Sequence, residues 1–523
     1  MIWQLKRISG IFVFILFFAS LVSAGDASPN TTKDLDKYFA ALAQNREFSG
    51  NVLIAEHGRV IYEKSFGYAD RETKRLNAAT TSFPTASIAK TITSTAILQL
   101  KEKGKLALTD PVVKYFPEFP YPSITIRHLL SHTSGLPGYG TLLDAQRKAN
   151  PGKVFTNADF LPDIKGTKIP LEFQPGDKYM YNNTNYLVLA LIIEKVSGVS
   201  YLNYVRENIF EPAGMHDTSL VLSFPDYQIL KEQTDYAGAY WYPHYWYSDE
   251  LMEPNKSIPF YAEYWSAFNF KGFSDYKTTT HDFLKYDKAL YDGKLLSETS
   301  LQEAFTPVKL NDGTVNSSGY GLGWEIDEKN PYGTIVNHSG GAMGFSCILL
   351  RNITKRQTII MYSNILPDNY TFVFVKDVLK LVNGQPVELP RKSIAREFGK
   401  TLVADGFDAA MKTLQKLKGD TSNFVLDEDQ FNSLGYDLMG DDNSMHLREQ
   451  HKYPEAVEVL KLNVEQFPTS SNAYDSYAEA LQKNGQKEEA IKMYKEALRI
   501  DPKNEHALRT LAELQKPAAG EKQ

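Results

Sequence analysis

Residues 83–91 read Phe83-Pro84-Thr85-Ala86-Ser87-Ile88-Ala89-Lys90-Thr91, and they continue into a segment with apolar residues at helical spacing. Pro84 and Thr85 are typical of the start of a helix, and the spacing predicts one apolar face. On such a helix Ser87 and Lys90 are three positions apart, so their side chains lie on the same face, one turn from each other. The sequence thus places a hydroxyl beside an amine where a helix begins.

Ser87 and Lys90 together can form an activated nucleophile. A hydroxyl is a poor nucleophile until a neighbour accepts its proton, and a lysine can accept it when burial and nearby positive charge lower its pKa. A serine in the first turn also faces the positive end of the helix dipole, which stabilises an oxyanion forming there. These features indicate acyl transfer by a serine hydrolase.

A serine followed by a lysine three residues later is a weak signal by itself, because Ser274 and Lys277 have the same spacing. An exposed helix serine is the alternative interpretation of Ser87. Only the pattern at Ser87 opens a segment with apolar periodicity, and this favours Ser87 as the nucleophile.

The N-terminus has the pattern of a secretory signal. Lys6 and Arg7 precede an apolar run from residue 11 to 22, and small residues lead to Ala24. We expect residues 1–24 to be a signal peptide cleaved near Ala24, which predicts a periplasmic or secreted protein. A retained transmembrane anchor is disfavoured, because a membrane span needs about 18 or more apolar residues.

Composition excludes some functions. The chain has 523 residues, 42% of them apolar, which is enough for a sizeable core and more than one domain. The formal net charge is −6 and there is no long basic stretch, so we expect no nucleic-acid partner. The single cysteine, Cys347, cannot form an intrachain disulfide.

Two histidines lie four residues apart in the block that runs from His128 to Gly135. Such a pair can bind a metal, but no glutamate between them and no cysteine nearby supports a metal site. A short helix that ends before Gly135, with histidines bonded to loop backbone, is favoured. We expect no metal and no cofactor.

A dense polar segment around Tyr181, Asn182 and Asn183 precedes an apolar helix that Gly198 ends. Polar groups before a buried helix are costly unless they cap it or take part in chemistry. A tyrosine here can share a proton with Ser87 and Lys90. The Tyr-x-Asn pattern also occurs elsewhere, but only at Tyr181 does it stand in a loop that closes on a helix.

The segment 236–276 is rich in aromatic residues and contains Trp241, Trp246 and Trp265. It is interpreted as an insertion that lines or covers the cleft, with ordinary packing as an equal alternative. Further on, His338 and Gly340 form the only His-x-Gly in the chain. Glycines there would let a substrate backbone approach an edge strand, and one of their amides could complete an oxyanion hole. A glycine-rich hairpin with an incidental histidine is the alternative.

Taken in order, these motifs resemble those of the β-lactamase-related serine hydrolases, a family with class C β-lactamases, D-alanyl-D-alanine carboxypeptidases, D-aminopeptidases and similar esterases. The resemblance covers about residues 35–365 and rests on Ser87-x-x-Lys90, the block 128–135, Tyr181-x-Asn183, Glu211-Pro212-Ala213-Gly214-Met215, Gly321-x-Gly323-Trp324 and His338-x-Gly340.

The resemblance implies an α/β (α+β) fold, with an antiparallel sheet flanked by helices and a helical lobe beside it. It implies Ser87 as nucleophile, Lys90 as base and Tyr181 as proton shuttle. The substrate would contact Asn183, His338 and Gly340, and the amides of Ser87 and Gly341 would form the oxyanion hole.

His338 takes a place often held by lysine in this family, and an unperturbed histidine is mostly neutral at pH 7. Strong β-lactam hydrolysis is therefore disfavoured. We expect a peptidase, amidase or esterase that acts on D-amino-acid peptides, amides or short esters. The rival hypothesis is a catalytically weak protein that binds a peptide or protein through its C-terminal part.

The C-terminal part resembles tetratricopeptide repeats, because Pro468 and Pro502 lie 34 residues apart, as do Ala456 and Ala490. We expect a hydrolase domain at 25–365, a helical linker at 366–425, all-α repeats at 426–516 with an insertion at 441–449, and a disordered tail at 517–523. The repeats either bind a peptide or protein partner or only pack on the hydrolase domain.

Overall fold

The computed structural model of the protein describes residues 29–220, 235–253, 267–274, 276–342, 344–366, 371–440 and 451–516. Several segments singled out in the sequence lie outside the described residues. They are the signal segment 1–24, Trp265, the insertion at 441–449 and the tail 517–523.

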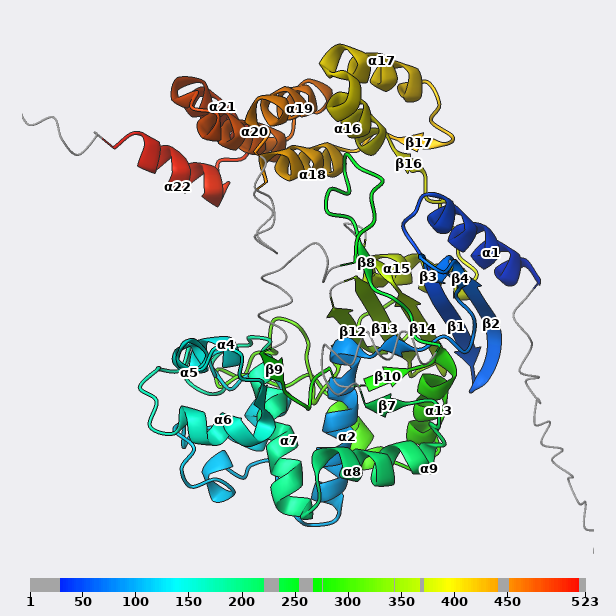
Figure 1. The fold of residues 1–523 in the computed structure, drawn as a ribbon, viewed down its shortest axis with the longest axis vertical. Helices are drawn as coiled ribbons and strands as arrows, with labels where there is room; N and C mark the ends of the chain where they lie inside the picture. Colours follow the sequence, from blue (N-terminus) through cyan, green and yellow to red (C-terminus); the bar gives the residue numbers. More distant parts are fainter. Residues whose placement is uncertain are drawn as a thin grey trace, which may run out of the picture.

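A six-stranded antiparallel sheet forms the centre of the N-terminal part (Figure 1). Its strands, in spatial order, are β11 (Glu325–Asp327), β12 (Ile335–Ala342), β13 (Phe345–Asn352), β14 (Gln357–Ser363), β1 (Gly50–Glu56) and β2 (Arg59–Phe66). β1 and β2 form a hairpin that turns at His57 and Gly58, both with positive φ. β1 also pairs with β14, so the first strand of this sheet in the sequence lies beside its last one.

Helices cover both faces of the sheet. α1 (Pro29–Gln44) and α15 (Thr371–Val382) lie on one face, where Val52 and Ile54 belong to a buried cluster. α13 (Thr280–Tyr291) and the start of α2 (Ala89–Glu102) lie on the other, where Leu53 and Leu349 are buried. Because successive strand residues point to opposite faces, strands that are apolar at every position are buried on both sides.

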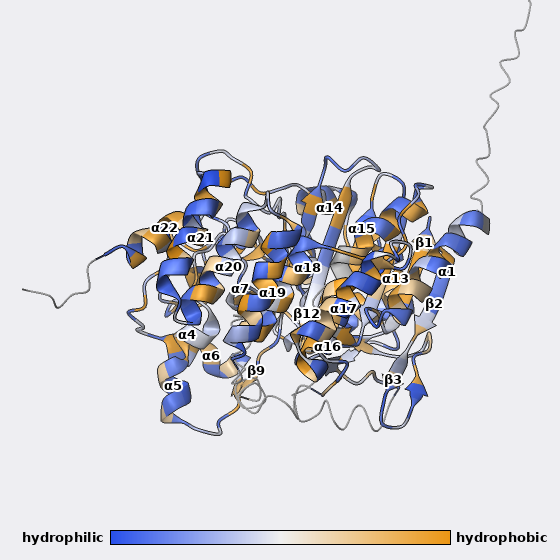
Figure 2. Ribbon diagram, turned by 90° about the horizontal axis from the view of Figure 1, so that it is seen from above, coloured by the Kyte–Doolittle hydropathy of each residue, from blue (hydrophilic) through white to orange (hydrophobic). Residues whose placement is uncertain are grey.

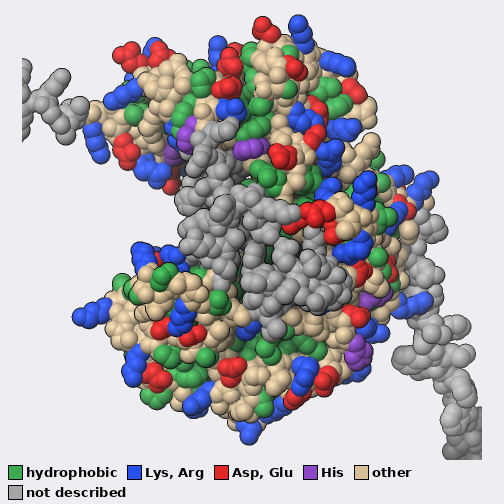
Figure 3. All heavy atoms as spheres, in the orientation of Figure 1, with side chains coloured by type: hydrophobic (Ala, Val, Ile, Leu, Met, Phe, Trp, Pro, Cys, Tyr) green, Lys and Arg blue, Asp and Glu red, His purple; other side chains and the backbone are tan. Residues whose placement is uncertain are grey.

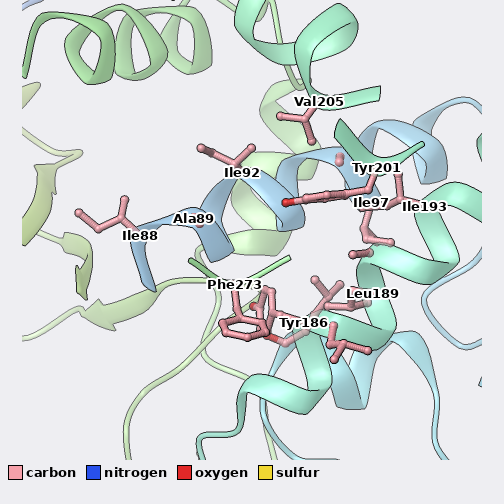
Figure 4. Packing of buried hydrophobic residues seen from close by; sticks show 14 of the residues in the cluster. Ile88, Ala89, Ile92, Ile97, Tyr186, Leu189, Ile193, Tyr201, Val205 and Phe273 are labelled. Atoms are coloured by element: carbon pink, nitrogen blue, oxygen red, sulfur yellow. The ribbon is translucent and has the colours of Figure 1, made fainter. Parts of the chain in front are cut away.

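The helical lobe is built around α2 and α7 (Asn183–Ser197). In Figure 4, Ile97 of α2 lies among Leu189 and Ile193 of α7 and Tyr201. The other elements of the lobe are α3 (Ile126–Leu130), α4 (Tyr139–Leu142), α5 (Asp144–Ala149), α6 (Asn157–Ile164), α8 (Tyr201–Val205), the π-helix η3 (Arg206–Phe210), α9 (Glu211–Ala213) and α14 (Glu298–Ala304).

α2 is enclosed more completely than its sequence predicts. The apolar spacing indicated one buried face, yet every residue from Ala89 to Leu100 is buried. The hydroxyls on its remaining sides are hydrogen-bonded: Thr93 Oγ1 donates to the carbonyl of Gly272 (2.7 Å) and Ser94 Oγ to that of Leu322 (2.6 Å). A helix with satisfied hydroxyls can be buried on all sides at little cost.

A second body of helices follows the sheet domain and lies above it in Figure 1. It contains α16 (Ile394–Asp405), α17 (Phe407–Lys418), α18 (Glu428–Met439), α19 (Tyr453–Gln466), α20 (Ser471–Lys483), α21 (Lys487–Ile500) and α22 (Glu505–Leu514). Apolar and hydrophilic residues alternate along these helices (Figure 2), and the apolar ones gather in two buried clusters. The expected linker at 366–425 is divided, because α15 packs on the sheet while α16 and α17 pack with α18.

The aromatic segment is used mainly for packing. Tyr242, Tyr245 and Trp246 belong to the core of the C-terminal helices, and the backbone N–H of Trp246 donates to Asp437 Oδ2 (3.2 Å). Trp241 lies in β8 (Tyr240–Trp241), which pairs with β15 (Ile365–Leu366). These residues follow the packing alternative, because their side chains join the C-terminal helices to the sheet body. Phe273 of the same segment lies instead beside Lys90, with its ring centroid 5.5 Å from Nζ.

The expected fold is confirmed: an antiparallel sheet flanked by helices, a helical lobe and an all-α C-terminal part. Within the described ranges, no single helix is long and apolar enough to cross a membrane. Among those residues, only the bent helix pair 183–197 and 201–213 is long and apolar enough when its two helices are taken together. On the face in Figure 3, lysine and arginine side chains intermingle with aspartate and glutamate.

Candidate active site

The turn that carries Ser87 is strained and tightly held. Ser87 lies in the 3-10 helix η1 (Ala86–Ile88), and Ala86 before it has φ of 42°, which is unfavourable for a residue with a side chain. The backbone N–H of Thr85 donates to the carbonyl of Tyr276 (2.8 Å), and Cys347 Sγ donates to the carbonyl of Thr85 (3.3 Å). Strain of this kind persists where surrounding contacts fix the backbone.

Gly340 allows β12 to lie against this turn. A Cβ at position 340 would come within 2.6 Å of Cys347 Sγ and 3.0 Å of Ala86 Cβ. The sequence interpretation assigned this glycine to the approach of a substrate backbone. Its buried position beneath the serine turn gives a different physical reason for it, namely close packing of protein against protein.

The structure brings Ser87, Lys90 and Tyr181 together from two distant segments. Lys90 Nζ donates to Ser87 Oγ at 3.0 Å, and the phenol of Tyr181 is also hydrogen-bonded to Ser87. Lys90 is completely buried, with Nζ 4.8 Å from the centroid of the Tyr181 ring and 3.4 Å from the carbonyl of Phe273. Two proton-exchanging groups therefore converge on one hydroxyl.

Tyr181 combines an accessible ring with a protected hydroxyl. The residue is 41% exposed, yet desolvation of its phenol raises the pKa far above its usual value. The hydrogen bond from Ser87 lowers the pKa of Tyr181, and nearby Tyr179 and Glu325 raise it. The phenol is therefore protonated at neutral pH and able to donate or accept at Ser87.

His338 is neutral and bonded at both ring nitrogens. Burial, and then the charge of Lys90, lower its pKa to about 3. Nδ1 donates to the carbonyl of Ser339 (2.6 Å), so Nε2 accepts from the hydroxyl of Tyr320 (2.9 Å). The substrate contact expected of His338 stays a prediction, and in this arrangement neither nitrogen is open to a ligand.

Asn183 lies at the first turn of α7 with an unused acceptor. Its Oδ1 is buried and has no hydrogen-bond partner among the described residues. The preceding Asn182 caps the helix, accepting from the backbone N–H of Thr184 (2.9 Å). A cavity of about 650 Å³ opens beside them, lined by Tyr181, Asn182, Asn183, Tyr139, Thr141 and Asp144 among others.

The outer edge of β12 is open beside the serine. β11 pairs with β12 only at residues 335–337, so residues 338–342 have no strand on that side among the described elements. Gly341 lies in this free part and is exposed. Its amide and that of Ser87 stay the predicted oxyanion donors.

Sequence reasoning missed the aromatic shell around Lys90. The ring centroids of Tyr186 and Phe273 lie 5.7 and 5.5 Å from Lys90 Nζ. Tyr320 belongs to the same aromatic group, and its hydroxyl is bonded to His338. Tyr320 precedes the Gly321-x-Gly323-Trp324 motif, which was the signal available for it. The two histidines are used as backbone partners: His128 Nδ1 accepts from the N–H of Thr125, and His132 Nδ1 from that of Asn182.

Comparison with known proteins relates two parts of the chain to families. A family described as beta-lactamase matches residues 35–382, and one described as tetratricopeptide repeat matches residues 471–514. The chain is 36% identical over 402 residues to penicillin-binding protein 4* of Bacillus subtilis strain 168. That alignment covers 73% of this chain and 86% of the relative.

Solved structures show the same similarity. The penicillin binding protein from Bacillus halodurans superposes with a TM-score of 0.53 and 26% identity, covering 66% of this chain and 99% of that one. The D-amino acid amidase from Ochrobactrum anthropi SV3 gives a TM-score of 0.53 and 22% identity, covering 67% and 98%. At that identity the second likeness concerns the fold alone.

Proposed function

The chain belongs to the β-lactamase family of serine hydrolases, as its ordered motifs predict, and from this premise we propose that it cleaves amide or ester bonds through an acyl-enzyme on Ser87. The observation that carries the proposal is the convergence of Lys90 and Tyr181 on the Ser87 hydroxyl. A residue with a buried amine on one side and a phenol on the other has the partners that an activated nucleophile needs.

In the proposed reaction, Ser87 Oγ attacks the substrate carbonyl and its proton passes to neutral Lys90 across the 3.0 Å contact. The amides of Ser87 and Gly341 stabilise the oxyanion. Tyr181 then delivers a proton to the departing amine or alcohol, and the carbonyl–leaving-group bond breaks. Lys90 then returns the serine proton to Tyr181. Water attacks the acyl-enzyme and gives a proton to the same pair, the bond between the acyl carbon and Ser87 Oγ breaks, and the pair passes that proton to Ser87 Oγ as the acid leaves.

The surroundings of Lys90 support a base. Complete burial disfavours an ammonium ion, while the nearby rings of Tyr181, Tyr186 and Phe273 favour it through cation–π attraction. These opposing effects suit an amine that gains and loses a proton in each cycle. His338 and His132 both stay neutral, so they do not compete with it for the proton.

The charges at the site support a substrate whose leaving side is uncharged. Both nitrogens of His338 are occupied, and Asp144 is the one charged side chain among the residues that line the described cavity. Glu325 acts on Tyr181 with negative charge. A substrate carboxylate would meet no free cation from these groups. We therefore propose esters, carboxamides and internal peptide bonds next to a D-amino acid as substrates.

This preference is testable with three matched compounds: an acyl-D-Ala-D-Ala peptide, its C-terminal amide and its C-terminal methyl ester. We expect kcat/KM for the amide and the ester to exceed that for the free acid by about 10-fold or more, the effect of roughly 1.4 kcal/mol. Ser87→Ala is the control for contaminating hydrolases. Equal or faster turnover of the free acid, or of a β-lactam, would contradict the preference.

A second role for the C-terminal helices is supported by the tetratricopeptide match, which covers α20 to α22. We propose that these repeats bind a peptide or protein. We also propose that the chain is exported through its N-terminal signal segment.

Labelling with a fluorophosphonate followed by mass spectrometry distinguishes an active enzyme from a protein that only binds a partner. An adduct on Ser87 is expected, and its absence would favour the binding role.

A further inference from the structure

His132 holds the chain on both sides of Tyr181. It follows α3, is fully buried, and has φ of 57°, the left-handed region that few non-glycine residues adopt. Its carbonyl accepts from the backbone N–H of Met180 (2.9 Å), and its Nδ1 accepts from the backbone N–H of Asn182 (3.1 Å). Its ring centroid lies 4.3 Å from that of Tyr181. The backbone carbonyl and the side chain of His132 thus accept hydrogen bonds from the residues on either side of Tyr181.

The hydrogen bonds also fix which ring nitrogen of His132 carries the proton. Ser134 Oγ donates to Asn185 Oδ1 (2.6 Å), which orients the Asn185 amide so that its Nδ2 donates to His132 Nδ1 (3.1 Å). Nδ1 therefore receives two donors, one of them a backbone N–H that cannot reverse. The proton of the neutral ring must be on Nε2.

The protonated nitrogen of His132 has no oxygen or nitrogen partner among the described residues. The ring lies between Tyr181 and Tyr320, with the Tyr320 centroid 4.9 Å away at an interplanar angle of 66°. Burial, and then the charge of Lys90, hold the pKa of His132 well below its usual value. The His132 ring is thus neutral, lies between two tyrosine rings, and accepts hydrogen bonds at Nδ1 alone. This arrangement is unsuited to proton transfer but suited to holding its neighbours in place.

We propose that His132 is a positioning residue that keeps the Tyr181 phenol on Ser87 through the Nδ1 bond to the Asn182 amide. The inference rests on the proposed function of Tyr181, and it adds a residue from a third segment of the chain to that site. It gives the second histidine of the block 128–135 a purpose that its spacing did not reveal.

The test compares three variants of the full chain. His132→Phe keeps the aromatic wedge and removes the acceptor, and we expect kcat to fall by about 100-fold with little change in KM, the cost of a misplacement of roughly 1 Å. His132→Asn restores an acceptor near Nδ1 and tolerates positive φ, so it should recover most of that loss. His128 lies in the same block, and among the described residues its ring is bonded only to the backbone N–H of Thr125 at the start of α3, so His128→Phe is the matched control and should stay close to wild type.

A double-mutant cycle distinguishes positioning from general damage. If His132 acts through Tyr181, His132→Phe should cause no further loss of acylation rate in a Tyr181→Phe background. Equal losses in both backgrounds, or a His132→Phe enzyme with kcat within about 3-fold of wild type, would overturn the inference. Full activity of Tyr181→Phe alone would overturn the proposed role of Tyr181 and this inference with it.

Circular dichroism checks that each variant is folded. Should His132→Phe be unfolded, His132→Gln takes its place, because its longer side chain puts an oxygen near Nε2 rather than Nδ1. Loss of kcat in His132→Gln with recovery in His132→Asn supports positioning, and equal activity of the two contradicts it.

Discussion

At the scale of single residues, Lys90 is surrounded by groups that stay neutral near pH 7. Its charge contributes to the lowered pKa values of His132 and His338, while burial raises those of Tyr181, Tyr186 and Tyr320. Proton transfer to and from Lys90 therefore changes the charge of the site centre without competition from these neighbours. In the proposed reaction this leaves Lys90 as the proton acceptor among these groups.

His338 makes the folded state sensitive to acid. Its pKa is about 3 in the folded protein and about 6.5 in an unfolded chain, so between these values the unfolded state binds one more proton. Stability from this group is complete above pH 6.5 and is lost as the pH falls toward 3, by up to about 1.4 kcal/mol per pH unit. We expect the stability difference between wild type and His338→Gln to shrink over that range.

Urea unfolding of the two proteins at pH 7.5, 6, 5 and 4 measures this difference. His216→Gln, which replaces an exposed histidine, is the control. A difference that stays constant from pH 7.5 to 4 would show that His338 does not titrate in this way.

Single residues also show how far sequence reasoning reaches. The sequence predicts Ser87, Lys90 and Tyr181 as site residues because each stands at a helix start with a local pattern. The bonding of His338 to Tyr320 and the grip of His132 on Tyr181 join segments far apart in the chain. No periodicity or spacing encodes such contacts, since they depend on how the lobe packs on the sheet.

At the scale of elements, β12 and η1 fit together only because position 340 has no side chain. We expect Gly340→Ala to cost about 1–3 kcal/mol of stability, as overpacking does, and to slow acylation by moving the Ser87 turn. Cys347→Ala should relieve part of the clash, because the nearest atom is Cys347 Sγ. The double variant should therefore be more stable than the sum of the two single changes predicts.

Urea unfolding and the rate of fluorophosphonate labelling at Ser87 measure both effects. Cys347→Ala alone is the control for the lost thiol. Strictly additive losses would mean that Gly340 is needed for another reason.

Elements also mark where sequence patterns failed. The C-terminal repeats are predicted from their 34-residue period, and the tetratricopeptide match confirms them. The complete burial of α2 is not predicted from the sequence, because the positions of its Thr and Ser residues indicate a polar face. The hydroxyls of Thr93 and Ser94 bond to carbonyls of other segments, which the sequence of the helix does not reveal.

At the scale of the whole molecule, the segment 242–246 fastens the C-terminal helices to the hydrolase part. Trp246 is 6% exposed, and Arg396 of α16 donates to the carbonyl of Tyr245 (2.8 Å). We expect Trp246→Ala to destabilise the C-terminal helices by about 3–5 kcal/mol, the cost of a large core truncation. Hydrolysis of a small ester should stay within about 2-fold of wild type.

Limited proteolysis and calorimetry follow the C-terminal helices, and ester turnover follows the active site. Tyr68→Ala, at an exposed aromatic residue, is the matched control. Equal loss of activity and of C-terminal stability would contradict the separation, because it would mean that the cleft depends on the docked helices.

The order of strands in the central sheet has a bearing on how the chain is made. Glu56 of β1 pairs with Gln357 of β14, which lies 301 positions later in the chain. The pairing of β1 with β14 therefore cannot form while the ribosome is still translating the lobe. Contacts between such distant residues form slowly. The topology thus keeps the central sheet open until its last strands have been made. An unfolded nascent chain is what a narrow protein-conducting channel can thread, so this strand order suits the export proposed for the chain.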